Sequence, residues 1–262
     1  MHDLILHGGT VIDGTGGDRY TADVGLSGDR ITAIGDLSET DAVRRIDVSG
    51  RIVAPGFIDV HNHSDGWLLK RPHFLPKTSQ GFTTEVLMLD GISYAPVSPD
   101  TARQWLFYLR GLNALRLEEY RGWESIGEFL SEFDRAAAQN VIGQVPYANV
   151  RSLACGFGKQ WVDDLQMRMI QDEIHKGMQD GAVGMSTGLD YIVQCYTTTD
   201  ELVEACKVIA EYDGVYTTHV RYKKGIIDGI REAIEIGKRS GCRVHISHVK
   251  GRDEQTVEAL LR

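Results

Sequence analysis

Short apolar runs alternate with glycine-rich turns at the start of the chain. The runs are Leu4–Leu6, Thr10–Ile12, Ala22–Leu26, Arg30–Ile34 and Arg44–Val48. Runs of this kind, separated by turn residues, are typical of short β-strands. The glycine-rich segment Gly14–Gly17 neither opens a helix nor contains a Gly-Lys-Ser/Thr sequence, so it predicts a turn rather than a phosphate-binding loop. We therefore expect residues 1–54 to form a small all-β unit.

Apolar runs alternate with amphipathic segments from residue 55 onward. The expected strands are Phe57–His63, Phe82–Leu89, Val141–Tyr147, Ala182–Ser186, Val215–Val220 and Arg243–Val249. The expected helices are Thr101–Leu115, Ser125–Gln139, Trp161–Gln179, one that starts at Thr199, Ile226–Arg239 and one that starts at Asp253. Strands that alternate with helices predict an α/β fold of parallel strands joined by right-handed crossovers. A closed eight-stranded barrel needs two more strands, so residues 55–262 predict either an open sheet or part of a longer protein.

Two histidines stand one residue apart at the end of the first of these strands. If Phe57–His63 is a strand, His61 and His63 lie on the same face and can bind one metal ion. The apolar run before them is typical of a strand that is buried on both faces, as in parallel sheets. Enzymes with parallel barrels carry their chemistry at the carboxyl ends of such strands.

Further metal-ligand residues follow the later strands. Asp90 comes after the second strand, His219 ends the fifth and His248 ends the sixth. His245 competes with His248, but the two face opposite sides of a strand, and His248 is nearer to its carboxyl end. Because the ends of parallel strands converge on one rim, we expect Asp90 and the histidines to meet around zinc or a similar ion.

Three polar side chains are predicted to bind a substrate beside this metal. By strand parity, Arg221 shares a face with His219, and Lys250 shares one with His248. Guanidinium and ammonium groups bind anionic groups well, so both are candidates to hold an anionic group of the substrate. Tyr191 follows the fourth strand, where its hydroxyl is expected to face the same pocket.

Composition and charge limit the class of protein. The chain has 262 residues, 42% of them hydrophobic, which is enough for a large core. Its formal net charge of −9 argues against a nucleic-acid partner. The N-terminus has no secretory pattern and no apolar span predicts membrane crossing, so we expect a cytoplasmic protein without a membrane partner. Four cysteines lack metal-site or disulfide spacing, and we expect them to be free thiols: Cys155, Cys195, Cys206 and Cys242.

The motifs resemble a known family. The segment Val53–His63, preceded by a small β unit, resembles the opening of the amidohydrolase superfamily. Four later segments are similar to the N-acyl-D-amino-acid deacylase (D-aminoacylase) family, namely Gln80–Glu85, Gly181–Tyr191, Tyr216–Arg221 and His245–Lys250. The resemblance implies a TIM-type (β/α)8 barrel with a β-sandwich built from both chain ends, so that residues 1–54 are part of the sandwich and residues 55–262 an incomplete barrel. It also implies one or two zinc ions and hydrolysis of the amide of N-acyl-D-amino acids; the implied ligands are His61, His63, His219 and His248.

The chain departs from this family at two places. Members that define the activity carry a metal-bridging cysteine in a Gly-Asn-Cys-Gly segment, and the matching stretch here is Met88–Gly91. A carboxylate also bridges metals, so Asp90 is expected to take that role. The family's catalytic aspartate lies on the eighth barrel strand, which places it beyond Arg262, and the chain is expected to be truncated.

Other functions remain open at this point. Cyclic-amide hydrolases and dipeptidases of the superfamily usually bridge their metals with a modified lysine or a glutamate after the fourth strand, where this chain has Ser186 and Thr187. The isolated chain as a catalytically inert fragment, and a metal-binding module without chemistry, are further alternatives. The sequence leaves the preferred substrate, the number of metal ions and the formation of a homo-oligomer open.

Overall fold

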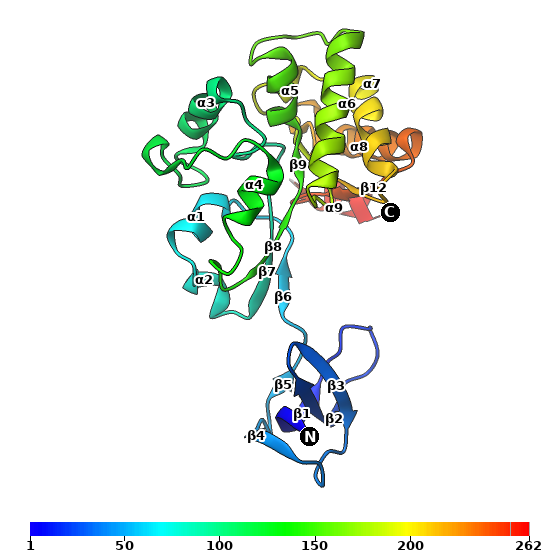
Figure 1. The fold of residues 1–262 in the computed structure, drawn as a ribbon. Coiled ribbons are helices and arrows are strands. Elements are labelled where there is room, and N and C mark those ends of the chain that lie inside the picture. Colours follow the sequence, from blue (N-terminus) through cyan, green and yellow to red (C-terminus); the bar gives the residue numbers. More distant parts are fainter. Residues whose placement is uncertain (252, 262) are drawn as a thin grey trace. The chain divides into compact units, whose positions relative to one another are not determined.

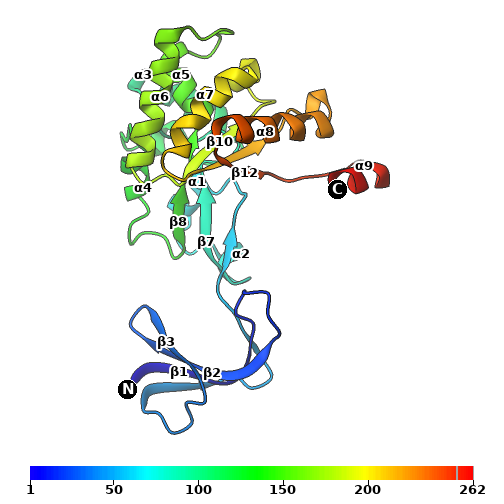
Figure 2. The ribbon, with the colours of Figure 1, turned by 90° about the vertical axis from the view of Figure 1, so that its right-hand side faces the viewer.

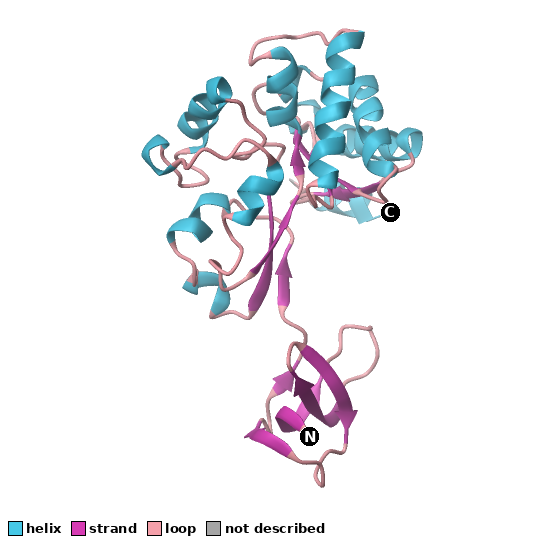
Figure 3. Ribbon diagram, in the orientation of Figure 1, coloured by secondary structure: helices cyan, strands magenta, loops and turns pink. Residues whose placement is uncertain are grey.

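The computed structural model describes residues 1–251 and 253–261, and the chain divides into two compact units, Met1–Phe57 and Ile58–Arg262 (Figure 1). The first unit contains strands and turns, and the second alternates strands with helices (Figure 3). Each unit is described separately. Within the described residues, no helix is both long and apolar enough to cross a membrane.

The first unit is a five-stranded sheet. Its strands are β1 (His2–Val11), β2 (Tyr20–Ser27), β3 (Arg30–Gly35), β4 (Ala42–Asp47) and β5 (Ile52–Val53). The order is β3-β2-β1-β4, and β5 also pairs with β1. Ile5, Val11 and Val24 are buried in its small core. Asp23 accepts hydrogen bonds from the backbone N–H groups of Gly8 and Leu37, at 2.8 and 3.1 Å, and so holds the irregular part of β1 and the loop after β3.

The strands of the second unit form two sheets. One has the order β6-β7-β8, from β6 (Phe57–Asp59), β7 (Phe82–Leu87) and β8 (Asn140–Gly143). The other has the order β12-β11-β10-β9, from β9 (Val145–Pro146), β10 (Gly184–Gly188), β11 (Val215–His219) and β12 (Arg243–Ile246). Neighbours in the four-stranded sheet are parallel, and so are β7 and β8. These parallel pairs confirm the α/β fold.

Helices connect and cover these strands. They are α1 (Asp65–Lys70), α2 (Leu75–Thr78), α3 (Pro99–Leu109), α4 (Ile126–Ser131), α5 (Tyr147–Cys155), α6 (Asp164–Gln179), α7 (Thr199–Ala210), α8 (Ile226–Ser240) and α9 (Glu254–Leu261), with the 3₁₀ turns η1 (Leu117–Glu119), η2 (Gln194–Tyr196) and η3 (Tyr222–Lys224). Consecutive helices α5, α6, α7 and α8 contact one another and pack on the four-stranded sheet (Figure 2). Their buried faces, with Ile174, Leu202 and Ile236, form one core with Met185 and Tyr216 of the sheet.

Several predicted boundaries were wrong. The strand expected over Phe57–His63 ends at Asp59, because Asn62 and the start of α1 turn the chain away. Val141–Tyr147 is divided into β8 and β9, and Tyr147 already begins helix α5, which the sequence analysis missed. Helices α1 and α2 were also missed. The helix predicted over Ser125–Gln139 ends at Ser131, where turns follow.

Candidate metal centre

Asp90 lies in a sharp turn after β7. Its backbone φ is +55°, and the neighbouring Gly91 has a φ of +69°. The turn is fixed by the four-stranded sheet, since Ser186 accepts a hydrogen bond from the Gly91 N–H at 3.0 Å and Gln194 donates one to the Asp90 carbonyl at 2.8 Å. The Asp90 side chain is only 2% exposed. The left-handed turn therefore places a carboxylate in a buried position defined by β7, β10 and η2.

Four histidines surround this carboxylate. The Nε2 atoms of His61 and His63 lie 3.8 and 3.4 Å from its Oδ1 and Oδ2 atoms. The Nδ1 atom of His219 lies 3.8 Å from Oδ2, and the Nε2 atom of His248 lies 3.8 Å from Oδ1. The five side chains predicted to bind metal thus meet at one place, although they come from four separate segments.

A loop, rather than a strand, brings His61 and His63 together. The His61 N–H donates to Asp59 at 3.1 Å, and the Asn62 side chain accepts from the Ser64 N–H at 3.0 Å. Asn62 also donates to the Val86 carbonyl of β7 at 3.1 Å. Asn62 therefore fastens the loop to the strand that leads to Asp90. The sequence analysis gave this residue no role, although its place between the two histidines was a signal.

His219 and His248 form the other side of the cluster. His219 is the last residue of β11, and His248 follows β12 with a φ of +34°. The Ser247 N–H donates to the Thr218 carbonyl at 2.9 Å and so extends the pairing of the two strands. The His219 Nδ1 and His248 Nε2 atoms are 3.0 Å apart. His245 lies within β12 in register with Thr217 and belongs to neither ligand group described below.

The electrostatics of the cluster favour a cation. Burial by itself raises the pKa of Asp90, but the hydrogen bond with His63 and the charges of the histidines outweigh it and hold this pKa below its ordinary value. Burial lowers the pKa of His61 and of His219. At neutral pH Asp90 is therefore ionised while these two imidazoles are neutral, as metal binding requires. Burial also acts to lower the pKa of His63, but its hydrogen bond with Asp90 and the charge of that carboxylate outweigh burial and raise it.

The donor set fits two adjacent metal positions. One group of candidate ligand atoms comes from His61, His63 and Asp90, and the other from Asp90, His219 and His248; within each group the atoms lie within 4.8 Å of one another. The Asp90 Oδ1 atom is buried and accepts no hydrogen bond in the part of the chain that the structure describes. A buried carboxylate oxygen without a donor is costly unless a cation satisfies it. Imidazoles with one carboxylate suit Zn²⁺.

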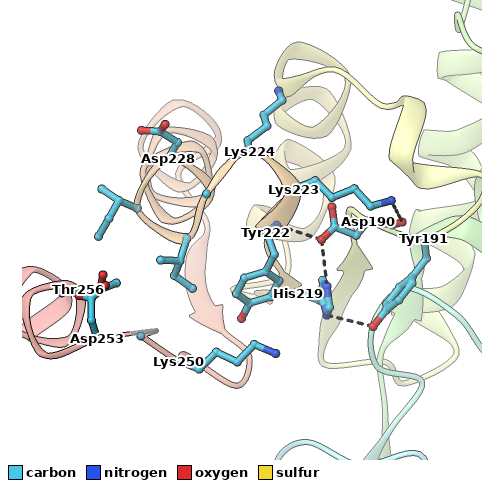
Figure 4. Close-up of a pocket in the computed structure, with 14 residues that line it drawn as sticks. Asp190, Tyr191, His219, Tyr222, Lys223, Lys224, Asp228, Lys250, Asp253 and Thr256 are labelled. Carbon is cyan, nitrogen blue, oxygen red and sulfur yellow. Dashed lines mark hydrogen bonds and ion pairs between the residues drawn. The ribbon is translucent and has the colours of Figure 1, made fainter.

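A cavity of about 930 Å³ opens beside this cluster (Figure 4). Tyr191 and His219 form one part of its lining, and Tyr222 and Lys250 form another. The Tyr191 hydroxyl lies 3.2 Å from the His219 Nδ1 atom and donates to Asp90 at 3.5 Å. The Lys250 ammonium lies 5.1 Å from the centre of the Tyr222 ring. Two of the three predicted substrate-binding residues therefore face this cavity.

Arg221 is placed differently from the prediction. It does not line the cavity, and its guanidinium is paired with Glu232, with Nε 3.0 Å from Oε2. The remaining N–H groups donate to Cys195 and Thr197, and to the Leu189 carbonyl. Strand β11 ends at His219, so the parity argument that aimed Arg221 at the metal does not apply. Its contacts instead fasten the loop that follows β10.

Asp65 also lies near the cluster, and one of its two carboxylate oxygens accepts hydrogen bonds from the protein. It is completely buried, and its Oδ1 atom accepts from the Ser93 hydroxyl at 2.5 Å and from the Met88 N–H at 3.2 Å. Burial raises its pKa. These contacts support the turn before Asp90, so the geometry gives Asp65 a positioning role.

Gly188, the last residue of β10, packs closely against the Asp90 turn. A Cβ atom at this position would lie 2.5 Å from the Asp90 carbonyl oxygen and against the ring of Tyr191. We expect Gly188→Ala to displace the carboxylate, to weaken Zn²⁺ binding and to lower the free energy of unfolding by about 1–3 kcal/mol, as overpacked cores do. Zinc titration and thermal unfolding test this. Gly158→Ala is the control, because no atom lies within 4 Å of its Cβ position; native zinc affinity in Gly188→Ala would contradict the expectation.

Comparisons with known proteins agree with the resemblance seen in the sequence. No family model matches the chain. D-aminoacylase of Alcaligenes xylosoxydans xylosoxydans is 36% identical over 264 residues, which cover 97% of this chain and 53% of that protein. A crystal structure of a D-aminoacylase, described as defining a subset of amidohydrolases, has a TM-score of 0.87 and 35% identity over 100% of this chain and 55% of its own.

A third comparison concerns a ligand complex. N-acyl-D-glutamate deacylase from Bordetella bronchiseptica, solved with zinc and a phosphonate mimic of the tetrahedral intermediate, has a TM-score of 0.84 and 33% identity, over 100% of this chain and 56% of its own. The chain spans about half the length of the curated relatives it matches. Near-complete coverage of this chain at such identity confirms the predicted resemblance to the D-aminoacylases and N-acyl-D-amino-acid deacylases.

Proposed function

We propose that this chain provides the metal centre of a zinc-dependent hydrolase that cleaves the amide bond of N-acyl-D-amino acids. The observation that carries the proposal is the position of Asp90, whose carboxylate is shared by two groups of candidate ligands. The relatives with these activities are named D-aminoacylase, N-acyl-D-aspartate deacylase and N-acyl-D-glutamate deacylase.

Each ligand has a separate part in this proposal. His61 and His63 would hold one Zn²⁺ ion together with Asp90, and His219 and His248 would hold another with the same carboxylate. When bound, Zn²⁺ polarises an acyl carbonyl and lowers the pKa of water, which supplies the nucleophile for amide hydrolysis. The buried Asp90 carboxylate balances the positive charge, and one or both positions are filled in the active protein.

The cavity residues suit an N-acylated amino acid. Burial and the nearby Asp90 charge raise the pKa of the Tyr191 phenol, so its hydroxyl stays protonated and can donate to the acyl oxygen. Lys250 lines the same cavity and presents an ammonium group to the substrate carboxylate. Arg221, with its donors taken by protein groups, acts in this proposal through the loop that it holds rather than by direct contact.

We further propose that residues 55–262 are part of a TIM-type (β/α)8 barrel and that residues 1–54 are part of a β-sandwich. The parallel strands β9 to β12, which follow one another in the sheet in chain order, support the barrel. Within the described residues, Asp65 accepts two hydrogen bonds on its Oδ1 atom, while its buried Oδ2 atom has no hydrogen-bond partner.

Metal removal is the direct test of this function. We expect dialysis against a chelator to abolish hydrolysis of N-acetyl-D-amino acids and added Zn²⁺ to restore it, because the proposed chemistry needs the metal. The assay compares the 262-residue chain with a longer form that extends through an eighth barrel strand. N-acetyl-L-amino acids and cyclic imides are the controls.

The outcomes separate the alternatives. Activity on the D-substrates supports the proposal, whereas preference for a cyclic imide would overturn it. If the longer form binds zinc but does not hydrolyse any substrate, the protein is a metal-binding module without catalytic activity. If both forms bind zinc but only the longer one hydrolyses the substrate, the 262-residue chain by itself is catalytically inert.

A further inference from the structure

The outward-facing nitrogens of His219 and His248 both meet one small group of side chains. We propose that Asp190 and Tyr222 act together as positioning residues, which orient these two imidazoles and select the nitrogen that each presents to a metal. This inference rests on the proposed metal centre but concerns residues to which no role has been given. The sequence analysis also missed both, although each directly adjoins a residue that it singled out.

Asp190 controls the far side of His219. The His219 Nδ1 atom faces the cluster, 3.8 Å from Asp90 and 3.0 Å from His248, while its Nε2 atom lies 3.6 Å from the Asp190 Oδ2 atom. A carboxylate at this position favours the tautomer with its proton on Nε2. The lone pair of Nδ1 is then directed to the metal position. The Asp190 carboxylate is itself held by the backbone N–H of Tyr222 at 3.0 Å.

Tyr222 controls the far side of His248. Its hydroxyl lies 3.0 Å from the His248 Nδ1 atom and 3.1 Å from the His248 carbonyl oxygen. The hydroxyl can therefore donate a hydrogen bond to the carbonyl and accept one from the Nδ1–H group, which leaves the Nε2 lone pair free. This Nε2 atom is the one that faces Asp90, at 3.8 Å. The Tyr222 ring also packs edge-on against His219, with centroids 4.8 Å apart.

The coupling runs through a single residue of η3. The Tyr222 backbone N–H donates to Asp190, which lies beside His219 (Figure 4). The Tyr222 hydroxyl contacts His248, so one short turn orients both imidazoles. His61, on the other side of Asp90, has no such arrangement: its Nδ1 atom is buried without a hydrogen-bond partner among the described residues. The pair should therefore support one metal position and not the other.

Metal titration of the apoprotein tests this inference without an activity assay. Partners of metal-bound histidines typically contribute about 10–100-fold to metal affinity. We expect Asp190→Asn and Tyr222→Phe each to weaken Zn²⁺ or Co²⁺ binding by about this factor and to change the Co²⁺ visible spectrum. His219→Ala serves as the reference, since it removes the ligand of that position. A separate titration of His61→Ala shows which binding event depends on His61, because that event is lost in this variant. In Asp190→Asn and Tyr222→Phe, the His61-dependent event should keep its native affinity.

Matched controls make the same chemical changes elsewhere. Asp180→Asn alters a carboxylate that accepts the Gly127 N–H at 2.9 Å, and Tyr212→Phe removes a hydroxyl 3.1 Å from the His175 Nδ1 atom. Both should bind metal as the native chain does. Circular dichroism establishes that every variant is folded, and two independent positioning variants keep the test valid if one fails to fold.

Several results would overturn the inference. One is native metal affinity in both positioning variants, or a loss of affinity no larger than in the control variants. Another is an equal loss of affinity at the His61-dependent binding event. The last is a native chain that binds no metal. The last result would also remove the proposed function. Selective weakening in a chain that binds metal but never hydrolyses an N-acyl-D-amino acid would uphold the inference while the proposed function fails.

Discussion

Replacement of Asp90 by alanine is expected to remove the proposed metal centre and with it the proposed hydrolytic activity. Its carboxylate belongs to both groups of candidate ligands found among residues 1–251 and 253–261. Without it, neither group of candidate ligands retains a carboxylate among the described residues, since Asp190 lies only at the far side of His219. Metal ions contribute several kcal/mol to transition-state stabilisation, so the loss in kcat/KM should be about a thousandfold or more.

The measurement for Asp90→Ala is zinc content by mass spectrometry, together with kcat/KM on an N-acetyl-D-amino acid. Asp90→Asn is the companion variant, because it keeps the shape of the side chain and removes only the charge; it should lose most of the zinc as well. Thermal unfolding in the presence of chelator should differ little between the variants and the native chain. Substantial hydrolysis by metal-free Asp90→Ala would contradict the role assigned to this carboxylate.

Substitution of Arg151 is expected to have the largest effect on stability. Arg151 is completely buried in α5, and its Nε atom lies 2.7 Å from Glu201. Its other N–H groups donate to the carbonyls of Lys159, Gln160 and Val193. Arg151→Met would leave the mostly buried Glu201 charge without its partner, which typically costs about 3–5 kcal/mol.

Chemical denaturation checks this value, and Arg231→Met is the matched control. Arg231 is largely exposed and pairs with Asp228 at 3.2 Å, so its loss should change the free energy of unfolding by about 0.5 kcal/mol or less. Because Val193 directly precedes Gln194, which holds the Asp90 turn, Arg151→Met should also weaken zinc binding. Equal stabilities of the two variants would show that the buried pair is not needed for the fold.

The alternation of strands and helices was visible in the sequence because hydrophobic periodicity reflects burial. It located every strand of the second unit to within a few residues. It failed where local polar contacts end an element. Asn62 ends the first strand early, and Pro146 leads directly into α5, so neither boundary follows from the apolar pattern.

The candidate metal ligands could be predicted from the sequence, but the contacts of the residues around them could not. His61, His63 and Asp90 stand out by residue type and by their position after strands, and the structure brings them together. Arg221 was misjudged because strand parity ends with the strand and because its partner, Glu232, lies on α8, which the sequence cannot place beside it. Tyr222 was missed for the same reason, since its contact with His248 depends on a fold between distant segments.

Anomalous diffraction at the zinc edge, from crystals of the chain grown with Zn²⁺, tests the central claim most directly. The account predicts one or two peaks within bonding distance of Asp90, one beside His61 and His63 and one beside His219 and His248. A zinc peak bound by other residues, or no peak in zinc-soaked crystals with an ordered Asp90, would contradict it.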